Sequence, residues 1–181
     1  MSTPKDYLIL KICAAGSYGV GKTSLIRRYA ENKFSSSYTP TIGVDITTKR
    51  VTVDNNKIKL LLVDTAGQEY FGKIRRAYFE GAFGCIIVYD ITRRESFLEL
   101  NRWISDFRGA VGEKALISII GNKIDLENSR TVSSEEGKSF TEQYDIPFYE
   151  CSAKLGGDII TDVYIDLVRK YLSAVNRNLG K

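Results

Sequence analysis

The chain has 181 residues, which suits a single domain over residues 1–181 with a core on both faces of a sheet. The net charge is +4 without a run of five or six like charges, so the sequence predicts a solvated surface and no nucleic-acid partner. Histidine is absent, which excludes Ser-His and Cys-His catalysis and any histidine metal site.

The first part of the chain alternates between apolar runs and polar or glycine-rich segments. Short apolar runs are typical of buried strands, and period-two alternation on both sides of a polar turn is typical of a β-hairpin. The predicted elements are a strand at 7–14, a helix at 22–32, a loop at 33–42, hairpin strands at 51–53 and 58–64 around residues 54–57, and a loop at 65–73.

The rest of the chain continues the alternation of strands and helices. Thr92 and Glu95 have the spacing of a helix capping box. The same spacing recurs at Ser133 and Glu136. The whole pattern predicts an α/β fold, with a six-stranded, mostly parallel sheet, one antiparallel strand and about five flanking helices. The further predicted elements are strands at 85–89, 115–120 and 147–149, a helix through 97–107 and an amphipathic helix from 158.

The turn after the first strand carries Gly-Ser-Tyr-Gly-Val-Gly-Lys-Thr at 16–23, which matches the phosphate-loop pattern G-x-x-x-x-G-K-[ST]. Glycines let successive N–H groups point at one anion, and the helix N-terminus adds a positive dipole end. Lys22 supplies a charge for the β- and γ-phosphates, and the Thr23 hydroxyl can ligate Mg²⁺. The predicted nucleotide contacts here are Ser17, Tyr18, Gly19, Val20, Gly21, Lys22, Thr23 and Ser24.

Asp64 ends the second hairpin strand and precedes Thr-Ala-Gly-Gln-Glu at 65–69. A carboxylate there can hold Mg²⁺, which prefers hard oxygen ligands and keeps water, although an Asp at a strand end is as often structural. Gly67 permits close approach of the backbone to a γ-phosphate, and Gln68 can orient a water for in-line attack.

Asn-Lys-Ile-Asp at 122–125 follows another predicted strand. The Asp125 carboxylate can accept hydrogen bonds from guanine N1–H and the 2-amino group, a donor pair that adenine lacks, so the motif favours GTP over ATP. We expect Asn122 to hold the loop and the Lys123 stem to cover one face of the base. The Ala153 N–H can donate to guanine O6. The base contacts predicted after the last strand are Ser152, Ala153 and Lys154.

The order of these motifs resembles that of the Ras superfamily of small GTPases over nearly the whole chain. The segments most similar to the Rab branch are Ser-Tyr-Thr-Pro-Thr-Ile-Gly-Val-Asp at 37–45, Asp-Thr-Ala-Gly-Gln-Glu at 64–69 and Val-Tyr-Asp-Ile-Thr at 88–92. The resemblance implies the P-loop NTPase fold, GTP and GDP as substrate and product, and Mg²⁺ as cofactor. It also implies a monomer whose residues 34–45 and 65–80 change conformation and bind an exchange factor, a GTPase-activating protein and effectors.

The resemblance assigns roles to further residues. Thr41 looks like the switch threonine that closes on Mg²⁺ and the γ-phosphate, and Tyr38 looks like the tyrosine that covers the phosphates. Phe34 matches the aromatic beside guanine, although from the sequence alone it is equally a loop anchor. With no arginine finger in the chain, we expect hydrolysis on the order of 10⁻⁴ to 10⁻³ s⁻¹. The implied metal ligands are Thr23, Thr41 and Asp64, and the implied catalytic residues are Gln68, Lys22 and Thr41.

Two features depart from the family pattern. Tyr18 stands where relatives usually carry Gly or Ser. Its ring either faces solvent or packs on residues 34–45, or it crowds Gln68 or an incoming arginine finger and slows hydrolysis. The positions of the aromatic triad that Rab proteins often present to effectors hold Ile46, Val63 and Tyr78, of which only the last is aromatic.

The C-terminal residues 178–181 hold neither a cysteine to prenylate nor a basic tail. Either a lipidated tail has been trimmed, or the protein is not lipid-anchored there. The sequence also has no signal peptide and no apolar stretch long enough to span a bilayer. The expected location is therefore cytoplasmic, with peripheral membrane association if a tail is missing.

Three functions compete at this point. An active GTPase switch is favoured by Gln68 and Thr41. A GTP-binding interaction module with negligible hydrolysis is favoured by Tyr18. A P-loop ATPase is disfavoured by the motif at 122–125, because that motif favours guanine.

Overall fold

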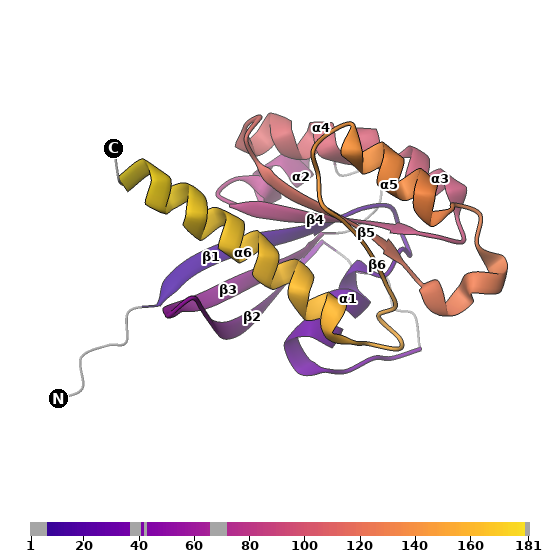
Figure 1. Ribbon diagram of the computed structural model, residues 1–181, viewed down its shortest axis with the longest axis horizontal. Coiled ribbons are helices and arrows are strands. Elements are labelled where there is room, and N and C mark those ends of the chain that lie inside the picture. Colours follow the sequence, from indigo (N-terminus) through magenta and orange to yellow (C-terminus); the bar gives the residue numbers. More distant parts are fainter. Residues whose placement is uncertain (1–6, 37–40, 42, 66–71, 180–181) are drawn as a thin grey trace.

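The computed structural model describes residues 7–36, 41, 43–65 and 72–179 and forms a central sheet between two layers of helices (Figure 1). The sheet order is β2-β3-β1-β4-β5-β6, and only the β2–β3 pair is antiparallel. This confirms the predicted six-stranded, mostly parallel sheet. The strands are β1 (Leu8–Ala15), β2 (Val44–Val53), β3 (Asn56–Thr65), β4 (Gly84–Asp90), β5 (Leu116–Asn122) and β6 (Phe148–Cys151).

Two helical layers cover the sheet, because its central strands are apolar on both sides. On one face, α1 and α6 pack together through the stacked rings of Tyr29 and Tyr164, whose centroids lie 3.9 Å apart. On the other face, Phe79 of α2 meets Phe107 of α4 edge to face. The α-helices of the described residues are α1 (Lys22–Glu31), α2 (Gly72–Phe79), α3 (Arg94–Leu98), α4 (Leu100–Val111), α5 (Ser134–Glu142) and α6 (Asp158–Leu179), with a 3₁₀ helix η2 (Ile124–Ser129).

The hairpin turn is tighter than predicted. Only Asp54 and Asn55 lie between the strands, with φ of 48° and 64°, whereas the sequence analysis placed 54–57 in the loop. Two consecutive residues with positive φ match the right-handed twist of the flanking strands, and Asn and Asp tolerate that conformation. Asn56 and Lys57 therefore pair with Val53 and Thr52 as strand residues, although both are polar and exposed.

The helix predicted through 97–107 is divided at Glu99 into α3 and α4, so the sheet carries six α-helices within the described residues rather than about five. The predicted capping box at Thr92 is wrong. The Thr92 hydroxyl donates to Asp90 Oδ1 at 2.7 Å, and the residue before α3 is Arg93, which makes no side-chain cap. The Thr92 side chain is directed to a buried carboxylate only two residues away, and local side-chain bonds of this kind compete with helix caps.

The register of the parallel strands gathers the predicted motifs at one edge of the sheet. Ala14 pairs with Asp64, and Asn122 pairs with both Asp90 and Cys151. The loops that follow these residues consequently emerge together. Within the described residues, no helix combines the length and apolar character that crossing a bilayer requires.

The second predicted cap is present, because Ser133 Oγ accepts a hydrogen bond from the Glu136 N–H at 3.1 Å at the start of α5. We predict that Ser133→Ala lowers the free energy of unfolding by about 1 kcal/mol, since the N–H loses its acceptor. Urea denaturation followed by circular dichroism measures the change. Ser134→Ala is the matched control because it keeps the cap, and an equal loss in both variants would contradict the assignment.

Candidate functional site

The phosphate loop runs from the end of β1 to the start of α1, and two of its glycines are required by close backbone packing. Gly16 has φ of +134°, and a Cβ there would lie 2.2 Å from the Val88 carbonyl oxygen. Gly21 has φ of +100°, and its Cβ would lie 2.2 Å from Nδ2 of Asn122. Any side chain at either position would displace β4 or the Asn122 amide, so the loop keeps its curl only with glycine.

Lys22 closes the inside of this loop. Its side chain is 6% exposed, and Nζ donates to the carbonyls of Gly16 at 2.8 Å and Ser17 at 2.9 Å. A buried ammonium must keep hydrogen-bond partners, and these bonds hold the charge under the curled backbone. The positive charge thus faces the same space as the N-terminus of α1, which favours an anion there.

Three oxygen-bearing side chains converge beside Lys22. Oγ1 of Thr23 lies 2.9 Å from Oγ1 of Thr41 and donates to Oδ2 of Asp64, which Thr41 also approaches at 3.1 Å. The other carboxylate oxygen, Oδ1, is buried without a hydrogen-bond partner among the described residues. Burial raises the pKa of the Asp64 carboxyl above its ordinary value, although the hydrogen bond from Thr23 and the charge of Lys22 act in the opposite direction.

This group of two hydroxyls and one carboxylate fits a Mg²⁺ ion. All three donors are hard oxygens, and a cation would satisfy the orphaned Oδ1 and offset the burial of the negative charge. Thr41 comes from the loop before β2, whereas Thr23 and Asp64 come from α1 and β3. The arrangement can therefore join a loop to the sheet through a bound cation.

The Asn122 amide joins the phosphate loop to the loop after β6. It is 1% exposed; Nδ2 donates to the Val20 carbonyl at 2.8 Å, and Oδ1 accepts from the Ala153 N–H at 3.1 Å. The expectation that Asn122 holds the loop thus has two specific bonds behind it. The same Ala153 N–H is the one predicted to reach guanine O6, and here it donates to Asn122.

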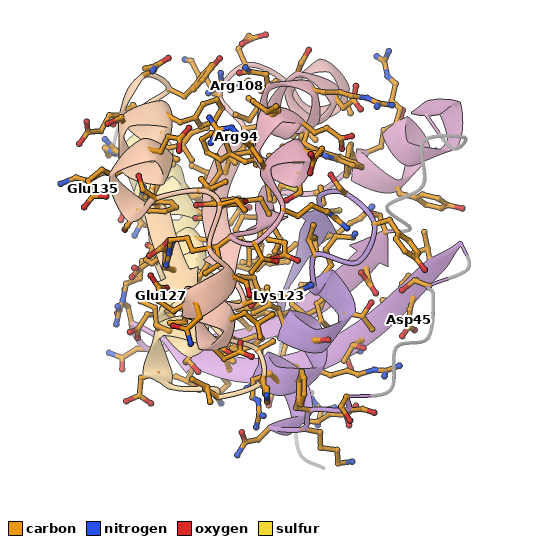
Figure 2. All side chains as sticks on the ribbon, turned by 90° about the vertical axis from the view of Figure 1, so that its right-hand side faces the viewer. Asp45, Arg94, Arg108, Lys123, Glu127 and Glu135 are labelled. Carbon is orange, nitrogen blue, oxygen red and sulfur yellow. The ribbon has the colours of Figure 1, made fainter. Side chains whose placement is uncertain are left out.

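Lys123 and Asp90 form a second connection at this edge, where Figure 2 places Lys123 near the middle of the view. Lys123 Nζ lies 2.6 Å from Asp90 Oδ2. Burial alone would raise the pKa of Asp90, but hydrogen bonds from Lys123 and Thr92 outweigh it, and the pKa lies below its ordinary value. The pair fixes the Lys123 stem along the cavity wall.

Asp125 stands at the far end of the site from the phosphate loop. Its Oδ1 accepts from Oγ of Ser152 at 2.5 Å, and Nζ of Lys154 lies 3.8 Å from Oδ2. Ser152 is itself buried, and its Oγ also accepts from the Leu155 N–H at 3.1 Å. The loop after β6 therefore orients the carboxylate of Asp125, a residue that lines the cavity.

These residues surround a cavity of about 380 Å³. Ser17, Val20, Asp64 and Ser152 are buried and are not among its lining residues, while Tyr38, Gly67 and Gln68 lie outside the described residues. The predicted site residues that line the cavity are Tyr18, Gly19, Gly21, Lys22, Thr23, Ser24, Phe34, Thr41, Asn122, Lys123, Asp125, Ala153 and Lys154.

The sequence analysis missed several residues of this site. Arg28 of α1 donates to the carbonyls of Ala153 and Lys154, both at 2.9 Å. These bonds connect the loop after β6, which we call the base loop, to the helix. No local pattern distinguishes such an arginine from a solvated one, since the contact spans 125 positions. Further lining residues that were not predicted are Arg27, Lys33, Ser35, Ser36, Thr65 and Leu126.

Comparison with known proteins decides the family. Residues 11–173 match the Ras family. The chain belongs to the Ras family, in its Rab branch. Relatives include "Ras-related protein Rab-1C" of Dictyostelium discoideum, 44% identical over 84% of this chain and 76% of the relative. "Ras-related protein Rab-11B" of the same organism is 46% identical over 82% of this chain and 67% of the relative. "Ras-related protein Rab-8B" of Homo sapiens is 37% identical over 99% and 86%.

Membership settles the fold class and the general activity. Ras-family proteins are GTPases with a P-loop NTPase fold, as the motif order suggested. At the positions of the Rab triad, Ile46 is 59% exposed and Val63 only 2%, although the two pair across β2 and β3. Tyr78 is half-buried in α2. At these three positions, the most exposed side chain of this Rab-branch protein is therefore the aliphatic Ile46.

We predict that Asn122→Ala lowers the free energy of unfolding by about 2 kcal/mol or more, because it leaves the Val20 carbonyl and the Ala153 N–H buried without a partner. Urea denaturation measures the loss. The control is Asn128→Ala, at an exposed position in η2, which we expect to be neutral. Equal stability of the two variants would show that the Asn122 amide does not hold the loops together.

Proposed function

We propose that this chain binds GTP and GDP with Mg²⁺ in the 380 Å³ cavity, and that it hydrolyses GTP to GDP and phosphate. The single observation that carries the proposal is that one cavity is lined by residues of the phosphate loop, by Thr23 and Thr41 that contact Asp64, and by Asp125. The residues that line the cavity include Lys22 of the phosphate loop and the Asp125 carboxylate. A nucleotide with anionic phosphates and a donor-bearing base edge matches these two charged groups.

Guanine selection rests on Asp125. The carboxylate accepts two hydrogen bonds from the guanine N1–H and 2-amino groups, and the bond from Ser152 fixes its direction. An adenine at this place would leave the carboxylate facing an edge without those donors. The binding free energy of an adenine nucleotide would therefore be less favourable by several kcal/mol. Lys123, held by Asp90, lies along one face of the base, and Phe34 borders the cavity on the side of the loop before β2.

Metal binding rests on Thr23 and Asp64, with Thr41 added when the preceding loop closes. A Mg²⁺ ion held there neutralises charge on the phosphate oxygens. Lys22 leaves the carbonyls of Gly16 and Ser17 and turns to the β- and γ-phosphates. Gln68 orients the attacking water; this role rests on the sequence motif, since Gln68 lies outside the described residues.

We expect hydrolysis by the chain alone to be slow, on the order of 10⁻⁴ to 10⁻³ s⁻¹, because GTPases of this kind receive their arginine finger from a partner. We further propose that residues 34–45 and 65–80 change conformation when the γ-phosphate leaves. The bonds of Thr41 to Thr23 and Asp64 support this, because they are the attachment of the first segment to the site.

The proposed partners act on these two segments: an exchange factor, a GTPase-activating protein and effectors. We propose a monomer located in the cytoplasm.

A second candidate function is a GTP-binding interaction module with negligible hydrolysis. The observation that favours it is the position of Tyr18 in the phosphate loop. This residue lines the cavity and is 43% exposed. Retention of GTP after purification favours this module, whereas GDP favours turnover.

Replacing Asp125 tests the choice of base. We expect Asp125→Ala to reduce the ratio of GTP to ATP affinity by about a hundredfold or more, because the variant loses the only carboxylate predicted to read guanine. Equilibrium titration with both nucleotides in Mg²⁺ gives the ratio. Glu127→Ala is the matched control, since it removes an exposed carboxylate two residues away in η2 (Figure 2). A preference for GTP that survives in Asp125→Ala would refute the assignment.

Replacing Tyr18 tests its effect on hydrolysis. We expect Tyr18→Gly to raise the single-turnover rate of GTP hydrolysis several-fold, because a ring beside the phosphates restricts the attacking water and Gln68. The rate is measured on protein preloaded with GTP, after addition of Mg²⁺. An unchanged rate would mean that the Tyr18 ring stays clear of the reaction.

A further inference from the structure

The segment between β4 and α4 lies against the outside of the phosphate loop and contacts two consecutive loop residues. Arg93 donates from Nη2 to the Tyr18 carbonyl, and its Nη1 lies 3.6 Å from the place of a Cβ on Gly19. Glu99 accepts a hydrogen bond from Ser17 Oγ at 2.5 Å. Neither Arg93 nor Glu99 is among the lining residues of the cavity. Both therefore act on the loop from behind.

The bond from Arg93 fixes the direction of a peptide group. A trans peptide is planar, and its C=O and the following N–H point in opposite directions. With the Tyr18 carbonyl turned outward to the guanidinium, the N–H of Gly19 points to the opposite, inner side of the loop, where phosphates bind. Gly19, with φ of +73°, has a backbone that permits either orientation of this peptide at low cost, so the orientation needs an external partner.

The charge of Arg93 strengthens the same N–H. A guanidinium is charged at any physiological pH, and a hydrogen bond from it to a carbonyl polarises the peptide group. The polarised N–H is a better donor to an anion.

We propose that Arg93 is a positioning residue for nucleotide binding: it holds the Tyr18–Gly19 peptide so that the Gly19 N–H faces the phosphates. The inference rests on the proposed function, because it needs a phosphate chain in the cavity. Arg93 acts through the backbone and does not itself touch the nucleotide. Its removal frees the peptide to rotate and takes one donor from the phosphates.

The chain offers a matched control in the next residue. Arg94 carries the same charge, but its guanidinium pairs with Glu136 of α5 at 3.1 Å on the exposed side of α3. Figure 2 shows Arg94 above Lys123, on the α3 side of the view. Removing Arg94 changes the net charge of the protein by the same amount and leaves the phosphate loop untouched.

The experiment compares release of a fluorescent GDP analogue from the full chain and three variants, chased with excess GDP in Mg²⁺. We expect release to be about tenfold faster in Arg93→Ala, as for loss of a charge-assisted hydrogen bond. Arg93→Lys keeps a charged donor and stays within about threefold of the unchanged chain. Arg94→Ala releases at the unchanged rate.

A second measurement separates positioning from a general loosening of the fold. Competition experiments give the affinities of GDP and GMP, which share the base contacts but differ in phosphates. Arg93→Ala is expected to weaken GDP more than GMP. Equal weakening of both, or equal effects of Arg93→Ala and Arg94→Ala, or release from Arg93→Ala at the unchanged rate, would overturn the inference. An unchanged chain that binds no GDP would overturn the proposed function and this inference with it.

Discussion

The two hydrogen bonds of the buried Asn122 amide are the constraint on which the site depends. One bond reaches the phosphate loop at Val20 and the other reaches the base loop at Ala153. These loops follow β1 and β6, which are separated by two strands in the sheet. Because Gly21 packs against the same amide, the phosphate loop has no room to move toward the base without breaking a buried bond. The distance between the two ends of a bound nucleotide is thereby set by the protein.

The parallel sheet makes this arrangement possible. Its strands end at one edge, so that Asp64, Asp90 and Asn122 all lie at the same end of the sheet although they are far apart in the chain, and Asp90 and Asn122 are direct neighbours. Oδ2 of Asp64 is partnered by Thr23 and Thr41, and Asp90 is partnered by Lys123 and Thr92. The partners come from segments that reach the edge from different directions.

Local patterns in the sequence were sufficient to predict the sheet and most of the residues that line the cavity. Apolar runs predicted the strands, and the glycines of the phosphate loop have the positive φ and close contacts that make glycine necessary. The turn at Asp54 and Asn55 was missed because the polar Asn56 and Lys57 lie in an edge hairpin where burial does not distinguish strand from loop. The division at Glu99 was missed because its dihedral angles are still helical, so the apolar periodicity continues through it.

Contacts between distant segments could not be predicted from the sequence. Arg28 reaches Ala153 across 125 positions and Arg93 reaches Tyr18 across 75, and neither arginine has a neighbour pattern that points to its partner. The Ala153 N–H was predicted to face guanine, and only the structure shows that it also has Asn122 as an acceptor. The roles of Tyr38, Gly67 and Gln68 stay predictions, since these residues lie outside the described part of the chain.

The most direct test of the account is to identify the nucleotide that accompanies the purified protein. Denaturing the protein and separating the released nucleotides by chromatography gives their identity and amount, before and after Mg²⁺ is removed with a chelator. The account predicts stoichiometric guanine nucleotide that is lost when Mg²⁺ is removed. Adenine nucleotide, or a protein that neither retains nor takes up guanine nucleotide in the presence of Mg²⁺, would contradict it.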